Sequence, residues 1–269
     1  MKRVSLNENS IKKKHPGGTG GGEALLCLET STSASSLALV SREGMPARDF
    51  RGPAPGPHTA DLFVRLKKLL EEGGSSLSGL LGVAVAAGPG SFTGLRVAVS
   101  AAKTLAWSTG LPLFAVDSLE ALAFGSVDLK CPVCAIFNAG QGELYAGIYS
   151  PPRSGGSAMR RIMEPAALTL DALCLELDKL ERMVLVGEGF LKNEQNFITR
   201  LGADRLVKAP ERRHLPDAAL VGELALKELE RCRVQDLFGF EPFYVRTGKM
   251  GLRLNTQNVA RKDTPVFGS

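Results

Sequence analysis

The chain has 269 residues, of which 44% are hydrophobic, and a formal net charge of +5. Each end, 1–15 and 246–269, carries five lysines or arginines and one acid, so the ends contribute +8 and the residues between them −3. A folded body of this charge argues against a basic nucleic-acid-binding face. We interpret the ends as solvated tails; the alternative is a non-specific handle on RNA phosphates.

The five cysteines are odd in number and lie in apolar surroundings, which indicates reduced thiols in a cytosolic protein. Cys131 and Cys134 have C-x-x-C spacing, but no second pair is present to complete a zinc site. No stretch approaches the ~20 uninterrupted apolar residues of a membrane span. The basic start is followed by no apolar segment of the kind that secretory signals carry. We therefore predict a cytoplasmic protein without a membrane span.

Residues 1–22 end in a glycine-rich linker and predict a flexible basic extension. Residues 23–127 then predict a first domain, in which three strands precede alternating helices and strands. Its expected elements are strands at 24–28, 36–41 and 46–51, a helix at 59–72, a strand at 82–87, a helix at 94–107, a strand at 112–116 and a helix at 117–124. This order is typical of a mixed sheet with helical crossovers.

Residues 128–246 predict a second domain, and 247–269 a flexible basic tail. The expected elements are strands at 131–137, 143–150 and 158–163, a helix at 170–181, a strand at 183–187, helices at 189–201 and 217–231, and a strand at 241–246. Two successive β-β-β-α units indicate a duplicated architecture, although the letters show no repeat.

The segment GPGSFTGLR, residues 88–96, joins an expected buried strand to a helix rich in small residues. Gly88 and Gly90 permit unusual backbone angles, and such a turn can aim main-chain N–H groups at an anion. Ser91 and Thr93 can cap the helix or donate to the same anion. The other interpretation is a tight turn whose glycines allow close packing. The segment lacks the lysine of a P-loop, so both interpretations stay open.

Four segments together resemble the TsaB (YeaZ) family: LCLETSTSASSLALV, GPGSFTGLRVAVSAAKTLA, PLFAVDSLEALA and EPFYVR. The similarity runs from about Leu25 to Arg246. It implies an α/β chain with the actin-like ASKHA fold of two RNase H-like domains with mixed sheets. It also implies work in making threonylcarbamoyladenosine, the modified adenosine next to the anticodon of tRNA.

The resemblance also implies partners. These are the larger catalytic relative TsaD and the TsaE ATPase, with a homodimer when the chain is alone and tRNA reached through the complex. Two positions depart from the family pattern. Glu29 stands where an Asp is usual, and Asn138-Ala139-Gly140 replaces a turn that often reads Asp-Ala-Arg.

The hairpin that contains Glu29, Thr30 and Ser31 resembles the first phosphate loop of ASKHA ATPases. A carboxylate at a strand end can hold hydrated magnesium, whereas the plainer interpretation is a polar hairpin turn. If the chain binds a nucleotide, we expect these residues to do so with Gly88, Gly90, Ser91 and Thr93. We predict no tightly bound cofactor; ATP or ADP with magnesium at the interface of a complex is the alternative.

The catalytic relative carries a metal-binding H-x-x-x-H pair, and the two matching positions here are Ser118 and Leu122. Two histidines four residues apart share a helix face and chelate one metal, which serine and leucine cannot do. No histidine pair has this spacing elsewhere, and the G-x-S-x-G pattern of serine hydrolases is missing. We therefore predict no catalytic residue and no metal ligand.

A stripe of small and apolar residues follows the glycine turn at helical spacing, and small residues let a second helix approach closely. The alternative is packing against the chain's own sheet. The resemblance implies that family members pair through helices of the first domain. The predicted interface residues are Leu62, Phe63, Leu66, Leu70, Gly94, Ala98, Ala101, Ala102 and Leu105.

The leading hypothesis is a non-catalytic partner subunit that binds and activates TsaD. One alternative is an independent ASKHA-type nucleotide-binding enzyme that uses Glu29, Thr30 and the glycine turn. A third, an M22 glycoprotease-like peptidase, finds no nucleophile or metal pair in the sequence.

Overall fold

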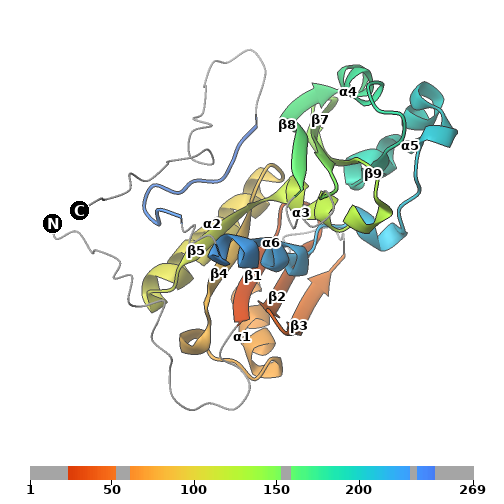
Figure 1. Ribbon diagram of the computed structural model, residues 1–269. Helices are drawn as coiled ribbons and strands as arrows, with labels where there is room; N and C mark the ends of the chain where they lie inside the picture. The colour runs from red at the N-terminus through yellow and green to blue at the C-terminus, as the bar shows by residue number, and fades with distance from the viewer. Residues whose placement is uncertain (1–23, 53–60, 153–158, 231–234, 246–269) are drawn as a thin grey trace, which may run out of the picture.

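The computed structural model describes residues 24–52, 61–152, 159–230 and 235–245 (Figure 1). Its first sheet has the order β3-β2-β1-β4-β5. The strands are β1 (Ala24–Glu29), β2 (Ser35–Ser41), β3 (Gly44–Arg51), β4 (Gly82–Gly88) and β5 (Leu113–Asp117). β1 pairs antiparallel with β2 and parallel with β4, so the sheet is mixed. Every residue of β1 and β4 is buried, as expected for strands covered on both faces.

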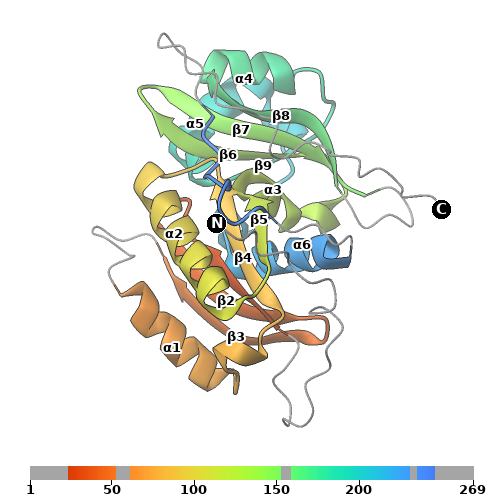
Figure 2. The same ribbon diagram turned by 90° about the vertical axis from the view of Figure 1, so that its left-hand side faces the viewer.

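Helices cover both faces of this sheet. One face packs against α1 (Leu62–Glu72) and α2 (Phe92–Thr109), which lie side by side in Figure 2. The other face packs against α3 (Ser118–Phe124) and α6 (Ala218–Glu230). We call the sheet with α1, α2 and α6 the first lobe.

The second lobe contains a four-stranded sheet of order β8-β7-β6-β9. Its strands are β6 (Val133–Gly140), β7 (Glu143–Ser150), β8 (Arg160–Thr169) and β9 (Val184–Val186). Helices α4 (Leu170–Leu177) and α5 (Glu188–Leu201) pack on one face. The opposite face turns toward the first lobe and packs against α3.

Helix α3 is shared by the two lobes (Figures 1 and 2). Its Ala121 packs with strands of the first sheet, whereas Leu119 and Leu122 pack with strands of the second. Asp117 caps this helix by accepting from the main-chain N–H groups of Leu119 and Glu120. A helix of only seven residues is marginal alone, so contacts with both lobes hold it in place.

Two expectations fail where distant parts of the chain meet. Helix α6 follows the second sheet in sequence but packs on the first, so the expected division after residue 127 does not hold for it. The expected strand at 241–246 is wrong for residues 241–245, which have no regular secondary structure. Pro242 lacks the N–H that a ladder needs, and Phe243 makes a single main-chain bond to Ala87 of β4.

The remaining differences lie at element ends. The third expected strand of the second domain extends to Thr169, and the helix that follows stops at Leu177, where Asp178 caps it. Residues 59–60 of the expected first helix, and the two basic tails, lie outside the described residues. None of the helices in the described ranges is both long and apolar enough to cross a bilayer.

Candidate functional site

The glycine turn packs directly against the hairpin between β1 and β2. The Ser91 amide donates to the carbonyl oxygen of Ser31 at 2.6 Å, and Thr30 Oγ1 donates to the carbonyl oxygen of Gly94 at 2.7 Å. Ser91 also caps α2, since its Oγ accepts from the Gly94 amide at 3.3 Å. The two candidate nucleotide-binding segments are therefore brought together, and they bind each other.

The glycines in this turn are required by close approach. A β-carbon on Gly94 would overlap the carbonyl oxygen of Thr30, and one on Gly90 would overlap that of Ser31. Gly88 has φ of 115° and leaves no room for a side chain beside the Phe243 carbonyl. Main chain of the hairpin thus fills the space in front of the turn. This arrangement favours the packing interpretation over a phosphate cradle.

The hairpin side chains are buried, unlike those of a solvent-exposed loop. Glu29, Thr30 and Ser31 are all at most 2% exposed, whereas Ser91 and Thr93 face solvent. Glu29 Oε1 accepts from the Ser31 amide at 2.5 Å, and Oε2 is buried without a hydrogen-bond partner. Burial raises the pKa of Glu29 to about 7, so its carboxyl is partly protonated at neutral pH.

The two positions that match the relative's metal ligands have structural roles. Ser118 is buried and its Oγ accepts from the Gly88 amide at 3.0 Å. Leu122 is buried in the core between the lobes. In the described part of the chain, no group of three or more His, Cys, Asp or Glu residues is placed to hold a metal. His214 instead accepts from the Gly187 amide at Nδ1 and stacks on Phe190; His15 and His58 lie outside the described residues.

The second family departure is also structural. Asn138 Oδ1 accepts from the Gly140 amide at 3.0 Å and so closes the turn between β6 and β7. Gly140, two residues after Asn138, has φ of 79°, a left-handed backbone angle that glycine adopts without strain.

Most of the predicted interface residues pack into the protein's own core. Of the predicted interface residues, only Phe63 is exposed; the buried ones are Leu62, Leu66, Leu70, Gly94, Ala98, Ala101, Ala102 and Leu105. The small residues let α2 lie close on the sheet, and Gly94 brings its start against the hairpin. For this stripe, the alternative interpretation of packing against the chain's own sheet is correct.

The accessible face of the two helices is a groove of about 390 Å³ that runs between α1 and α2. It is lined by Leu62, Phe63, Arg96, Val97, Ser100, Ala101 and Thr104. Val97, Ser100 and Thr104 each precede a residue of the predicted stripe by one position, which is a rotation of ~100° about the helix axis. On these two helices the exposed large apolar side chains are Phe63, which lines the groove, and Val64, Phe92 and Trp107.

Residues 235–245, which we call the C-terminal strap, hold the other side of α2. Lys103 Nζ donates to the Phe240 carbonyl at 2.8 Å, and the Phe240 ring is buried in the first-lobe core. Tyr244 packs its ring 5.3 Å from that of Phe92 and accepts at its hydroxyl from Arg96 Nε at 3.3 Å. The Arg96 guanidinium lies 3.9 Å from the Phe92 ring centroid. Arg96 therefore belongs to both the groove and the strap.

Comparisons with known proteins agree with this architecture. Residues 54–199 match the family model of TsaD, tRNA N6-adenosine threonylcarbamoyltransferase. The TsaB protein of Bacillus subtilis, named for tRNA threonylcarbamoyladenosine biosynthesis, is 28% identical over 82% of this chain and 93% of its own length. The Escherichia coli TsaB is 30% identical over 52% of this chain and 62% of its own.

Solved structures give the same result. YeaZ from Pseudomonas aeruginosa superposes with a TM-score of 0.69 and 27% identity, covering 83% of this chain and all of that one. This likeness confirms the expected actin-like ASKHA architecture with two mixed sheets. The matched family model spans more than half of the 269 residues, and relatives named TsaB or YeaZ match most of the chain. The chain therefore belongs to the TsaB (YeaZ) family.

Proposed function

We propose that this chain is a non-catalytic partner subunit that binds a TsaD-type threonylcarbamoyltransferase and activates it. The reaction served is threonylcarbamoylation of the adenosine next to the anticodon of tRNA. Relatives named for this biosynthesis support the pathway. Matches to the transferase itself, such as that of Geobacillus kaustophilus at 33% identity over 43% of this chain, support a partner of similar fold.

The observation that carries the proposal is the groove between α1 and α2. Phe63 and Arg96 line this groove, and the Arg96 guanidinium lies over the exposed ring of Phe92. Aromatic and arginine side chains dominate the binding energy of protein interfaces. Phe63 is 57% exposed, and a partner helix laid into the groove would remove it from water.

The non-catalytic part of the proposal has separate support. Ser118 and Leu122 are used for packing and hydrogen bonding where the catalytic relative has its metal ligands. Ser91, in the glycine turn, caps α2 by accepting from the Gly94 amide. These side chains position the main chain, and the chemistry belongs to the partner.

The same face would serve a homodimer when the chain is alone, because a two-fold pair uses one surface on both copies. Binding of TsaD would then replace one copy. We further propose that TsaE joins this pair, that tRNA is reached through the complex, and that ATP or ADP with magnesium enters only at the interface of the complex.

The test is co-purification with TsaD, followed by a tRNA modification assay with and without this chain. Phe63→Asp places a charge in the groove and should weaken pairing at least tenfold. A tenfold loss corresponds to about 1.4 kcal/mol of binding free energy, and loss of an interface anchor usually costs more than that. Leu175→Asp is the matched control, since Leu175 is 68% exposed on α4 of the second lobe. Full pairing and full modification with folded Phe63→Asp would overturn the proposal.

The second candidate function is an independent ASKHA-type nucleotide-binding enzyme. It is favoured by two buried atoms without hydrogen-bond partners, Glu29 Oε2 and Ser31 Oγ, beside the glycine turn. Calorimetric titration of the isolated chain with ATP and magnesium tests it. Binding that disappears in Glu29→Gln would support the enzyme, and absence of binding in the wild type would exclude it.

A further inference from the structure

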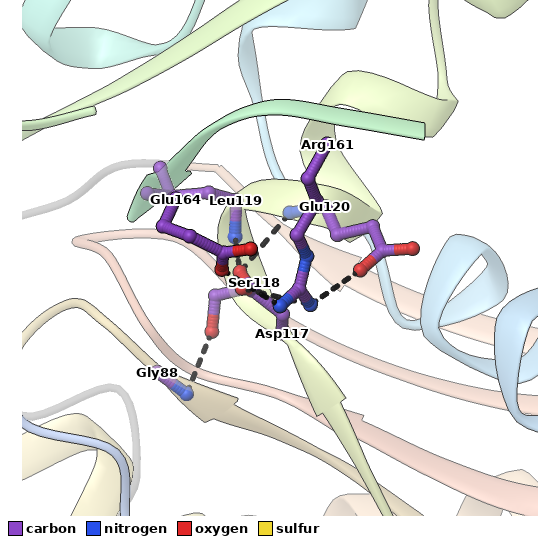
Figure 3. A network of polar contacts seen from close by, with 7 residues as sticks. All are labelled: Gly88, Asp117, Ser118, Leu119, Glu120, Arg161 and Glu164. Atoms are coloured by element: carbon purple, nitrogen blue, oxygen red, sulfur yellow. Dashed lines mark hydrogen bonds and ion pairs between the residues drawn. The ribbon is translucent and has the colours of Figure 1, made fainter. Parts of the chain in front are cut away.

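The two lobes are joined by an ionic contact as well as by apolar packing. Arg161 of β8, in the second lobe, reaches the start of α3, which follows β5 of the first sheet (Figure 3). Its Nη2 lies 2.7 Å from Glu120 Oε2 and 3.4 Å from Asp117 Oδ2. Its Nη1 lies 3.2 Å from Glu164 Oε2 on the same strand. One guanidinium thus faces three carboxylates.

The carboxylates around Arg161 differ in their exposure to solvent. Glu164 is largely exposed, whereas the side chain of Asp117 is 9% exposed and has its Oδ1 engaged as the cap of α3. Tyr149 of β7 is fully buried and its hydroxyl has no hydrogen-bond partner. Asp117 therefore faces Glu120 from α3, Arg161 and Glu164 from β8, and Tyr149 from β7.

A charge on Asp117 is costly in these surroundings. Burial raises the pKa of Asp117 to about 7, and Glu120 adds to the effect, while Arg161 and the two capping amides act in the opposite direction. If β8 moved away and water entered, the carboxyl would return toward its ordinary value near 3.8. The arrangement with the lobes in contact consequently binds a proton more tightly than an opened one.

We propose that Asp117 and Arg161 form a charge-controlled latch between the two lobes, closed when Asp117 is neutral and loosened when it ionises. The sign follows from linkage: a carboxyl with a raised pKa in the closed state favours that state below its ordinary pKa, and this preference is lost as the pH rises through about 7. Arg161 limits the loss by pairing with the ionised carboxylate. The latch is a property of the isolated chain and stands apart from the proposed partner.

The contact also continues into the glycine turn. Ser118 follows Asp117 directly, and its Oγ accepts from the Gly88 amide at 3.0 Å (Figure 3). Movement at the start of α3 would therefore disturb the main chain that leads into α2. The lobe contact and the α2 face are connected by two adjacent residues.

The experiment is amide hydrogen exchange on the full chain at pH 6 and pH 8, with rates corrected for the intrinsic effect of pH. The probes are the amides of Gly88, Leu119 and Glu120. In the wild type we expect these amides to exchange roughly tenfold faster at pH 8. One pKa unit of coupling corresponds to a tenfold change in the equilibrium between the closed and the opened state. Amides of α5 should show no such difference.

Three variants decide the outcome. Asp117→Asn keeps a capping side chain without a charge, so its probes should exchange at pH 8 at least as slowly as those of the wild type at pH 6. Arg161→Met leaves the ionised Asp117 without its cation and should exchange fastest at pH 8. Arg200→Met is the control, because it removes an ion pair with Asp171 that lies wholly within the second lobe.

Two results would overturn the latch. One is a wild type whose corrected rates at the three probes are the same at both pH values. The other is a pH difference that Asp117→Asn retains in full. Should Arg161→Met fail to fold, the comparison of the wild type with Asp117→Asn still decides between these results.

Discussion

The carbonyl oxygen of Thr30 occupies the place where a β-carbon at position 94 would stand, so the main chain of Gly94 packs directly against the main chain of Thr30. The contact is reinforced by Thr30 Oγ1, which donates to the Gly94 carbonyl. This relationship explains why a glycine opens α2, although glycine weakens a helix. The β1–β2 hairpin fixes the position of the start of α2, and it thereby also fixes the position of the groove on the other side of this helix.

Gly94→Ala should therefore destabilise the fold. The added carbon overlaps backbone that cannot rotate away, and overpacking of this kind costs about 1–3 kcal/mol. Thermal unfolding of the two proteins measures the effect as a loss of several degrees in Tm. Gly79→Ala is the control, since a β-carbon there meets only Ser76 Oγ at 3.5 Å, an ordinary contact. Equal melting temperatures for Gly94→Ala and the wild type would contradict the packing interpretation.

Bulk on α2 should act differently on its two faces. Ala102 is fully buried against the first sheet, so Ala102→Trp should unfold or strongly destabilise the chain. Ser100 lines the groove and is exposed, so Ser100→Trp should leave the free energy of unfolding within about 0.5 kcal/mol of the wild type while blocking pairing. Sedimentation with TsaD beside a melting curve separates the two effects. Normal pairing by Ser100→Trp would place the interface elsewhere.

The sequence predicts most individual elements of this fold because each depends on neighbours in the chain. The uninterrupted apolar runs of β1 and β4 are typical of strands covered on both faces, and both are found. Asp117 begins the helix expected at 117–124, and aspartate is a favoured N-cap residue, which is the role that it has in α3. These features need no knowledge of contacts between distant residues.

Contacts between distant parts of the chain could not be read in the same way. The stripe at Ala98, Ala102 and Leu105 suits a helix on a sheet as well as a helix on a partner, and periodicity does not distinguish them. The sequence of α6 does not indicate which of the two sheets the helix packs against. Arg161 lies in an exposed-looking strand, and only the fold brings it to Asp117, 44 residues earlier in the chain. The sequence therefore predicts a packing stripe on α2 but does not show which surface the stripe packs against.

Glu29→Gln should stabilise the protein at high pH. The pKa of Glu29 is raised from 4.5 to about 7, chiefly by burial, so the folded state favours the protonated form. Its contribution to stability is present below pH 4.5 and is lost as the pH rises through 7. Glutamine keeps an acceptor for the Ser31 amide without the charge. At pH 8 the variant should gain up to about 3 kcal/mol over the wild type, the energy of a shift of this size.

Urea unfolding of both proteins at pH 5 and pH 8 measures this gain, which should shrink at pH 5. Glu43→Gln serves as the control because Glu43 is exposed in the β2–β3 turn. A gain of the same size at both pH values would show that the charge of Glu29 is not its cause.

Tyr244→Ala should loosen the C-terminal strap and weaken partner binding. The substitution removes the ring that packs on Phe92 and the hydroxyl that accepts from Arg96. An aromatic pair contributes about 0.5–1.5 kcal/mol beyond its buried area, so a small loss in Tm is expected. Freed from Tyr244, Arg96 and Phe92 lose their fixed positions beside the groove, and we expect a lower affinity for TsaD. Tyr244→Phe keeps the ring and loses only the hydroxyl, and it should retain most of the affinity. Titration of TsaD with each variant in a calorimeter tests the order wild type, Tyr244→Phe, Tyr244→Ala; equal affinities would separate the strap from the docking surface.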